Sequence, residues 1–422
     1  MGDHDVCIVS MARTPVASFG GRFKDRTAVD LGIVAARSAI ERANISPEMV
    51  EDVYFGNVLS GNLGQAPAKQ VSLGAGVPPS VPCTTVNKVC ASGMKSIEIA
   101  ALNIASGTCK VALAGGFESM SKVPRYVEES RFSKGGRKYG DLSADRKELN
   151  IGTLRDGLAR DGLSDPYSNY EPMGAFAVQC AVDESISRQE QDEYAAASYA
   201  RSKAASKNKK LSREIVPLED LDYDEECFAR EVNFESLSKL KPAFKLPKTY
   251  KGNQDLPHNQ SVTAGNASTM NDGAAALILA SRRFCKENGL PILATIKGWG
   301  NASQIPEKFT STPALATEKA LTHAGLELNA IEYFEINEAF SIVPIVVAKK
   351  LGFDWKEKNV NVYGGAVSIG HPLGMSGARI TMSLVSTLLN ENGRYGVAAI
   401  CNGGGGASAL VIENENVANS RL

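Results

Sequence analysis

Short apolar runs alternate with segments of helical periodicity along the N-terminal part of the chain. The run Val6–Ser10 ends at an Arg-Thr-Pro turn and predicts a buried strand. Apolar side chains recur at helical spacing over Ala28–Ala43, and Asn44 marks the end of this helix. By the same criteria we expect strands at residues 50–58 and 110–114, a helix at 94–104, and an end to the last strand at Gly115-Gly116. This alternation predicts an α/β protein with a mostly parallel sheet covered by helices.

The pattern then occurs a second time. The segment AIERANISPEMVEDVYFGNV, which starts at Ala39, aligns without a gap with ALTHAGLELNAIEYFEINEA, which starts at Ala320. Further along, Ser92-Gly93 recurs as Ser376-Gly377, and VALAGG resembles VAAICNGG. Repeated spelling of this kind indicates a duplicated unit. We therefore expect two similar halves, residues 1–121 and 266–422.

The segment between the halves, residues 122–265, has a different pattern. It is polar and contains a long loop-like stretch at 245–260. Its length exceeds that of an ordinary loop, so we expect an inserted loop or lid domain. A cluster of lysines lies within it, at Lys203, Lys207, Lys209 and Lys210. The cluster fits a solvated helix face or a phosphate site.

Composition narrows the class of protein. The 422 residues carry a formal net charge of −1, so nothing in the balance predicts nucleic acid as a partner. We find no run of about 18 apolar residues, and therefore expect no membrane span. The eight cysteines are scattered without a C-x-x-C pair, which favours reduced thiols in an intracellular protein. The C-terminal Ser420-Arg421-Leu422 resembles a peroxisomal address, so we expect the peroxisome, with the cytoplasm as the alternative.

One cysteine lies where a nucleophile is expected. Cys90, in VNKVCASGMK, follows a strand-like segment and precedes a helix. The N-terminus of a helix stabilises a thiolate, which can hold an acyl group as a thioester. The alternative is an inert buried thiol.

A nucleophilic cysteine needs a base, and the chain has only four histidines. His371 lies in GGAVSIGHPLGMSGAR, between glycines that allow close approach of a ligand, and is the best candidate. Cys401 precedes four glycines, whose N–H groups can bind an oxyanion or form a plain turn. Asn337-Glu338-Ala339-Phe340 follows a predicted strand, where the Asn and Glu are placed to orient water or an imidazole.

Taken together, VCASGMK, NEAF, GHPLGMSGAR and CNGGGGAS resemble the thiolase family, in the family's order and over nearly the whole chain. The spelling is most similar to the biosynthetic type, which reversibly joins two acetyl-CoA into acetoacetyl-CoA and CoA. The segments GNVLSGNLGQAPAKQ and TAGNASTMNDGAA also resemble this type. The implied fold is two duplicated α/β halves, each with a mixed five-stranded sheet covered by helices, plus the inserted loop domain.

The resemblance also implies roles for these residues. Cys90 would be acylated by the first acetyl-CoA while His371 takes its proton, and Cys401 would remove the α-proton of the second. One oxyanion site would use His371 with a water held by Asn337. The other would use the backbone N–H groups of Cys90 and Gly403.

The resemblance further implies binding residues and partners. Coenzyme A thioesters would be the substrates, with no covalently bound cofactor, and the protein would be a homo-oligomer, either a dimer or a tetramer. Ser268 would contact the pantetheine, with Tyr199 near the same loop. Some family members bind potassium there, and the matching positions are Tyr199 and the backbone carbonyls of Ala264, Gly265, Ala267 and Val367.

Two positions depart from the biosynthetic type. The family's His-Met-Gly is replaced by Pro172-Met173-Gly174, and Ser236 stands where a CoA-binding Lys is often found. Pro172 and the C-terminal tripeptide favour the alternative, a degradative 3-ketoacyl-CoA thiolase that cleaves longer acyl chains. A non-catalytic thiolase-fold protein would be expected to lack one of the residues Cys90, His371 and Cys401, and all three are present.

Overall fold

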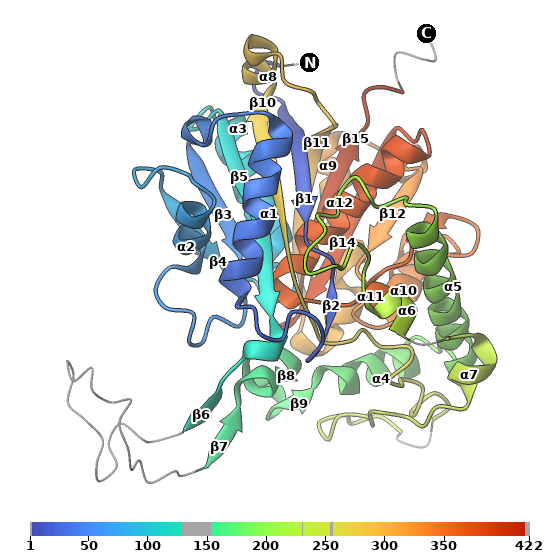
Figure 1. The fold of residues 1–422 in the computed structure, drawn as a ribbon. Coiled ribbons are helices and arrows are strands. Elements are labelled where there is room, and N and C mark those ends of the chain that lie inside the picture. The colour runs from blue at the N-terminus through green and yellow to red at the C-terminus, as the bar shows by residue number, and fades with distance from the viewer. Residues whose placement is uncertain (1, 128–152, 230, 254–255, 418–422) are drawn as a thin grey trace.

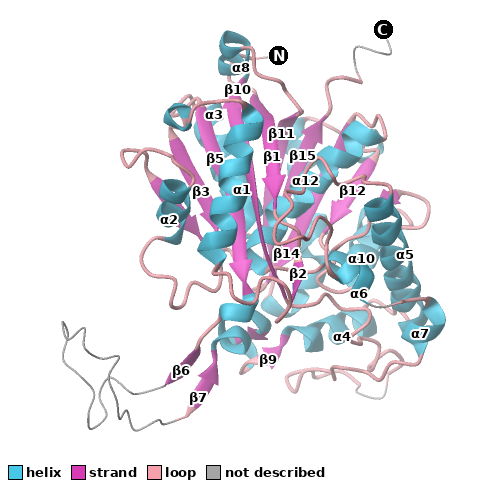
Figure 2. Cartoon of the chain, in the orientation of Figure 1, coloured by secondary structure: helices cyan, strands magenta, loops and turns pink. Residues whose placement is uncertain are grey.

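A computed structural model describes residues 2–127, 153–229, 231–253 and 256–417 (Figure 1). The C-terminal tripeptide on which the peroxisomal prediction depends lies outside the described residues. One large sheet runs through the molecule, with strand order β13-β12-β14-β15-β11-β1-β10-β5-β3-β4 and the short β2 (Ala17–Ser18) paired to β10. Figure 2 shows this sheet with helices packed against it.

The sheet consists of two halves with the same topology. The N-terminal half contains β1 (Val6–Arg13), β10 (Asn271–Ser281), β5 (Val111–Ser119), β3 (Asp52–Gly56) and β4 (Cys83–Val86). The C-terminal half contains β11 (Ala294–Ser303), β15 (Gly406–Glu413), β14 (Tyr395–Asn402), β12 (Tyr333–Ile336) and β13 (Asn359–Val360). In each half the first two pairings are antiparallel and the last two are parallel. The predicted duplication with mixed five-stranded sheets is therefore confirmed.

The expectation of a mostly parallel sheet, based on alternation alone, is wrong. The last strand of each half along the chain is β10 or β15. It lies between the first strand of its half and the parallel strands, and it pairs antiparallel with the neighbour on each side. The halves join where β1 pairs with β11, at Val6 and Ile296. The strand β10 belongs to the N-terminal half of the sheet, although the sequence division placed it after residue 266. The three-domain division itself stays a prediction.

Individual elements agree with local sequence signals. Helix α1 spans Ala28–Ala43 as predicted, because Thr27 and Asp30 form a capping box and Asn44 ends it in the left-handed conformation. The predicted strand end at Gly115-Gly116 is wrong, since β5 continues to Ser119. A Cβ at Gly115 would lie 2.0 Å from a β10 carbonyl oxygen, so this glycine allows close packing within the sheet instead of ending the strand.

The helices form layers around the two halves of the sheet. Helix α1 and α2 (Pro67–Gly74) pack on the outside of the N-terminal half, and α9 (Thr312–Ala324) and α10 (Ile342–Leu351) on the outside of the C-terminal half. Between the halves lie α3 (Ser92–Ala105) and α12 (Leu373–Asn390). Side chains of β5 alternate between the inner and outer cores, so the sheet is buried on both faces.

The two central helices cross at glycines. A Cβ on Gly377 would lie only 2.4 Å from the backbone N of Met94, and one on Gly93 would lie 2.7 Å from the Gly374 oxygen. These are the glycines of the repeated Ser-Gly pair. Their close approach places the N-terminal ends of α3 and α12 next to each other, at the junction of the two halves.

The inserted segment has helices of its own as well as loops. It contributes two small hairpins, β6 (Arg125–Val127) with β7 (Leu154–Asp156) and β8 (Ser164–Asp165) with β9 (Glu171–Pro172). Its helices are α4 (Met173–Asp183), α5 (Arg188–Lys207), α6 (Glu226–Ala229) and α7 (Phe234–Ser238), and α8 (Arg282–Asn288) follows β10. In Figure 1, β8, β9 and α4 lie below the lower edge of the sheet.

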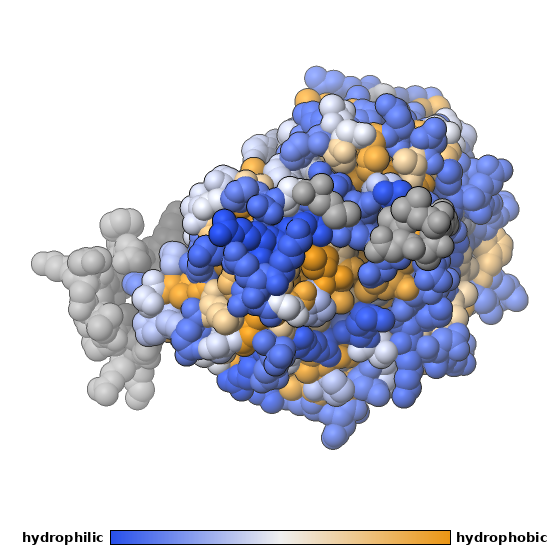
Figure 3. Space-filling model, turned by 90° about the horizontal axis from the view of Figure 1, so that it is seen from above, coloured by the Kyte–Doolittle hydropathy of each residue, from blue (hydrophilic) through white to orange (hydrophobic). Residues whose placement is uncertain are grey.

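No helix among the described residues is long and apolar enough to span a membrane. The face seen from above is hydrophilic over most of its area, with an apolar region near its middle (Figure 3).

Candidate active site

Cys90 lies in the short segment between β4 and α3. Val89 before it has a φ of 47°, an uncommon and strained conformation for a β-branched residue. The turn is held by Ser92, whose hydroxyl accepts from the Lys88 N–H at 2.8 Å and donates to the Val89 oxygen at 2.6 Å. This backbone places Cys90, partly exposed, on the wall of a cavity.

The thiol of Cys90 is protonated at rest. Burial raises its pKa to about 12, although the N–H groups of Gly403 and of Cys90 itself act in the opposite direction. Those two N–H groups therefore point at the sulfur atom. A helix N-terminus alone does not produce a resting thiolate here, so a base has to take the proton during any reaction at Cys90.

His371 lies between α11 (Ala366–Ile369) and α12, and its ring contacts Ser376 of α12. The Ser376 hydroxyl lies 2.6 Å from His371 Nδ1 and 2.8 Å from the Pro372 oxygen, so with a proton on Nδ1 the hydroxyl accepts from the ring and donates to that oxygen. The other ring nitrogen, Nε2, is buried and has no hydrogen-bond partner among the described residues. Burial, and then the charge of Arg379, lower the pKa of His371 to about 3. The imidazole is therefore neutral, with a free lone pair on Nε2.

The two polar residues of the NEAF motif, Asn337 and Glu338, lie in different environments. Asn337 follows β12 and is 0% exposed, and neither polar atom of its side chain has a partner among the described residues. A buried unsatisfied amide of this kind calls for a water or a ligand. Glu338 instead accepts bonds from Tyr194 and Ser198 of α5. The expectation that Glu338 orients water or an imidazole is therefore wrong, because its carboxylate ties the insert to the core.

Cys401 lies in β14, one residue before its end, and is 0% exposed. Burial raises the pKa of Cys401 well above its ordinary value, and the neighbouring Cys90 adds to this effect. The glycines after it form the turn between β14 and β15, with φ of 81° at Gly404 and Gly405. The run is thus a strand-to-strand turn that also directs the Gly403 N–H toward Cys90.

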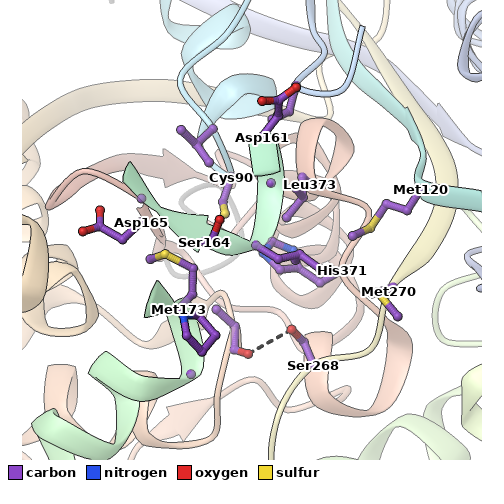
Figure 4. A pocket seen from close by; sticks show the side chains of 18 of the residues that line it. Cys90, Met120, Asp161, Ser164, Asp165, Met173, Ser268, Met270, His371 and Leu373 are labelled. Atoms are coloured by element: carbon purple, nitrogen blue, oxygen red, sulfur yellow. Dashed lines mark hydrogen bonds between the residues drawn. The ribbon is translucent and has the colours of Figure 1, made fainter. Parts of the chain in front are cut away.

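The cavity beside Cys90 has a volume of about 1100 Å³. Cys90, Met173, Ser268 and His371 lie around the same space in Figure 4, and Gly403 also lines it. The cavity is formed by both halves and by the insert, which supplies Met173. Cys401 and Asn337 are buried and do not line the cavity.

The other predicted residues lie in two groups. Ser268, Ala264 and Ala267 line the cavity, and the Ser268 hydroxyl donates to the Ala339 oxygen at 2.9 Å (Figure 4). Tyr199 and Val367 pack together in a small apolar cluster with Leu237.

Two positions, Pro172 and Ser236, differ from the biosynthetic type in sequence. Pro172 lines the cavity at the start of α4. Ser236 instead caps α7 together with Asn233. Only the first departure therefore touches the cavity directly.

Two residues at the site were missed from the sequence. Glu118 in β5 and Asn271 in β10 hold the backbone on which His371 lies, and the Asn271 side chain accepts from the His371 N–H at 2.9 Å. A carboxylate inside an apolar strand run was the available signal for Glu118. Asn271 lies in the segment TAGNASTMNDGAA, but no local pattern indicates its contact with His371, because the two are 100 residues apart.

Known proteins match this chain over nearly its whole length. Residues 6–283 match the family model for the thiolase N-terminal domain and residues 290–414 the model for the thiolase C-terminal domain. An acetyl-CoA acetyltransferase of Schizosaccharomyces pombe is 47% identical, over 98% of this chain and 100% of the relative. A cytosolic acetyl-CoA acetyltransferase of Gibberella zeae is 47% identical, over 97% of this chain and 98% of the relative.

A solved structure is also similar. The thiolase Acat5 of Ascaris suum, in complex with coenzyme A, superposes with a TM-score of 0.85 at 40% identity, over 97% of this chain and 100% of that one. Both family models, the relatives and this structure cover nearly the whole chain. The chain therefore belongs to the thiolase family.

Proposed function

We propose that this protein is an acetyl-CoA C-acetyltransferase that reversibly joins two acetyl-CoA into acetoacetyl-CoA and CoA. The observation that carries the proposal is the geometry around Cys90. A protonated thiol, a neutral imidazole with a free Nε2 and a backbone N–H from Gly403 meet at one cavity. The relatives named acetyl-CoA acetyltransferase support the choice of acyl group.

In the first step Cys90 takes the acetyl group. His371 Nε2 accepts the Sγ proton, and the sulfur attacks the thioester carbonyl. The oxyanion that forms would lie against the N–H groups of Cys90 and Gly403, which already point at the sulfur. The bond to the CoA sulfur then breaks, and CoA leaves with the proton held by His371.

In the second step Cys401 gives its thiol proton to the neutral His371 and, as the thiolate, removes the α-proton of another acetyl-CoA. The enolate carbon attacks the Cys90 thioester, the bond to the Cys90 sulfur breaks, acetoacetyl-CoA forms, and the Cys90 thiolate takes the proton held by His371. The enolate oxygen would be stabilised by His371 and by a water on the unsatisfied amide of Asn337.

Coenzyme A and potassium are assigned to the loop after residue 263. Ser268 would contact the pantetheine, because it lines the cavity. Among the described residues, no backbone N–H donates to the carbonyl oxygens of Ala264, Gly265 or Ala267, which fits a hard cation.

Tyr199 and Val367 would complete the potassium site, since both contact Leu237 and a Cβ on Gly265 would meet the same leucine. We expect a higher melting temperature in KCl than in NaCl at equal ionic strength, and expect Tyr199→Phe to reduce that difference. Equal melting temperatures in the two salts would remove potassium from the proposal.

Acyl-chain length tests the proposed function. Cleavage of acetoacetyl-CoA by CoA should exceed cleavage of 3-ketohexanoyl-CoA and longer substrates. Comparable or faster turnover of the longer chains would instead establish the degradative type, for which Pro172 in the cavity wall is the sequence argument.

We further propose a homo-oligomer, either a dimer or a tetramer. The strand β4 is a partly exposed edge of the sheet, and an open edge can pair with a second copy. Light scattering coupled to gel filtration tests this, and a monomer would contradict it.

For location, the relative named cytosolic favours the cytoplasm over the peroxisome. A fluorescent fusion with and without Ser420–Leu422 separates the two.

A further inference from the structure

The carboxylate of Glu118 is saturated with hydrogen-bond donors. Its Oε1 accepts from the Leu59 N–H at 3.1 Å and from the Asn57 amide at 3.0 Å. Its Oε2 accepts from the N–H groups of Val58 at 3.1 Å and Gly374 at 2.9 Å. The side chain is 0% exposed, so bulk solvent does not compete for these hydrogen bonds.

Four donors around two oxygens favour the carboxylate form of the side chain. Burial is the largest influence on the pKa of Glu118 and raises it to about 7, against the N–H groups of Gly374, Leu59 and Val58, which favour the charged form. If Glu118 were protonated, or replaced by Gln, its side chain would carry an O–H or N–H donor. That donor would face the surrounding N–H groups, which need an acceptor. The isosteric Gln is therefore a specific probe of this site.

The donors belong to the two segments that hold the reacting groups. Gly374 is in the first turn of α12, three residues after His371, and Pro372 offers this helix no side-chain cap. Glu118 thus caps α12 from a distant strand. Val58 and Leu59, on the other side, pack in one apolar cluster with Val89, Cys90 and Leu373.

The fit around Gly374 shows how closely these parts are joined. A Cβ on Gly374 would lie 2.8 Å from the Phe117 oxygen and 3.0 Å from the Glu118 carboxylate. The start of α12 is therefore seated directly on β5, and only glycine leaves room for the hydrogen bond.

We propose that Glu118 is a positioning residue whose carboxylate fixes His371 relative to Cys90 by joining the first turn of α12 to the loop 57–59. The proposal rests on the proposed acyl-transfer chemistry of Cys90 and His371. Glu118 touches neither substrate nor reacting atoms. Its charge also helps to raise the pKa of Cys90, and its main effect is on the Cys90–His371 geometry, so it changes the rate of the chemical step more than substrate binding.

The test is Glu118→Gln, measured in steady-state thiolysis with the 3-ketoacyl-CoA that the wild type cleaves fastest. We expect kcat to fall about 10- to 100-fold, with KM changed by less than about 3-fold. Asn57→Ala removes one donor and keeps the carboxylate, and we expect a smaller fall in kcat, of about 3- to 10-fold.

The matched control is Glu214→Gln. Glu214 is also 0% exposed and accepts from Arg13 at 2.6 Å, but it lies away from the cavity. We expect this variant to lose thermal stability and keep a kcat within about 2-fold of the wild type.

A wild-type kcat in Glu118→Gln would overturn the proposal. The proposal would also fail if Glu214→Gln, with the same drop in melting temperature as Glu118→Gln, lost as much kcat as Glu118→Gln does. If Glu118→Gln does not fold, Asn57→Ala decides, and an unchanged kcat there also overturns it. The chain-length profile of the wild type separately decides the proposed function. The ratio of variant to wild type on the best substrate decides the role of Glu118, so the two can fail independently.

Discussion

At the scale of single residues, the direction of one hydroxyl proton determines which nitrogen of His371 is free. When the Ser376 hydroxyl donates to the Pro372 oxygen, the ring donates to it from Nδ1. This leaves the Nε2 lone pair for the Cys90 proton. The same serine lies one turn into α12, so the helix itself holds the tautomer.

We therefore expect Ser376→Ala to lower kcat by about 10-fold with little change in KM, because the ring loses the acceptor that fixes its tautomer. Steady-state thiolysis measures this. Ser383→Ala, on the same helix near Arg379, is the control and should keep the wild-type kcat. An unchanged kcat in Ser376→Ala would mean that the tautomer is held by other contacts.

His371 should also make the fold acid-labile. Its pKa is lowered to about 3 from an ordinary value of 6.5, so the unfolded chain binds a proton where the folded chain does not. Its stabilising contribution is complete above pH 6.5 and is lost as the pH falls toward 3. Melting temperatures of wild type and His371→Asn should therefore shift relative to each other, with the wild type losing more stability between about pH 6.5 and 4.5. Parallel curves for the two proteins would contradict a buried neutral imidazole.

The sequence could predict Cys90 and His371 at the cavity because each lies in a short motif with its own local geometry, and Ser268 and Gly403 because their motifs resemble those of the thiolase family. It could not predict Glu118, whose donor Gly374 is separated from it by 256 residues. It also misjudged Glu338, since α5 of the insert takes up that carboxylate. Long-range partners of this kind leave no periodic or motif signal.

At the scale of elements, the crossing of α3 and α12 places the two reacting groups together. Gly93 and Gly377 remove the side chains that would otherwise separate the helices. The repeated Ser-Gly pair marked these positions in the sequence, but its meaning depends on a contact between the two halves. Helix α1, in contrast, was predictable to the residue because Thr27, Asp30 and Asn44 are local signals.

Gly377→Ala should force the helices apart, since its Cβ would lie 2.4 Å from the Met94 nitrogen. We expect a loss of about 1–3 kcal/mol in the free energy of unfolding, together with lower kcat. Chemical denaturation and thiolysis measure both. Leu102→Ala is the control, because Leu102 is on the exposed side of α3 and 42% exposed, and it should be nearly neutral. Wild-type stability in Gly377→Ala would show that the crossing tolerates a methyl group.

At the scale of the whole molecule, two copies of one topology share a continuous sheet and enclose one cavity. The repeat in the sequence predicted the two halves. It did not predict that β1 and β11 join them edge to edge, or that β10 lies with the N-terminal strands. These pairings depend on how the duplicated units pack. The N-terminal half supplies Cys90 and the C-terminal half supplies His371 and Gly403, so the site exists only where they meet.

The central claim is that Cys90 carries the acyl group and that Cys401 acts only afterwards. Mass spectrometry of the full-length protein mixed with acetyl-CoA, followed by peptide mapping, tests it most directly. We predict one acetyl group on Cys90 in the wild type and in Cys401→Ala, none in Cys90→Ala, and no acetoacetyl-CoA from either variant. An unmodified Cys90 in the wild type, or an acetyl group carried by Cys401, would contradict the account.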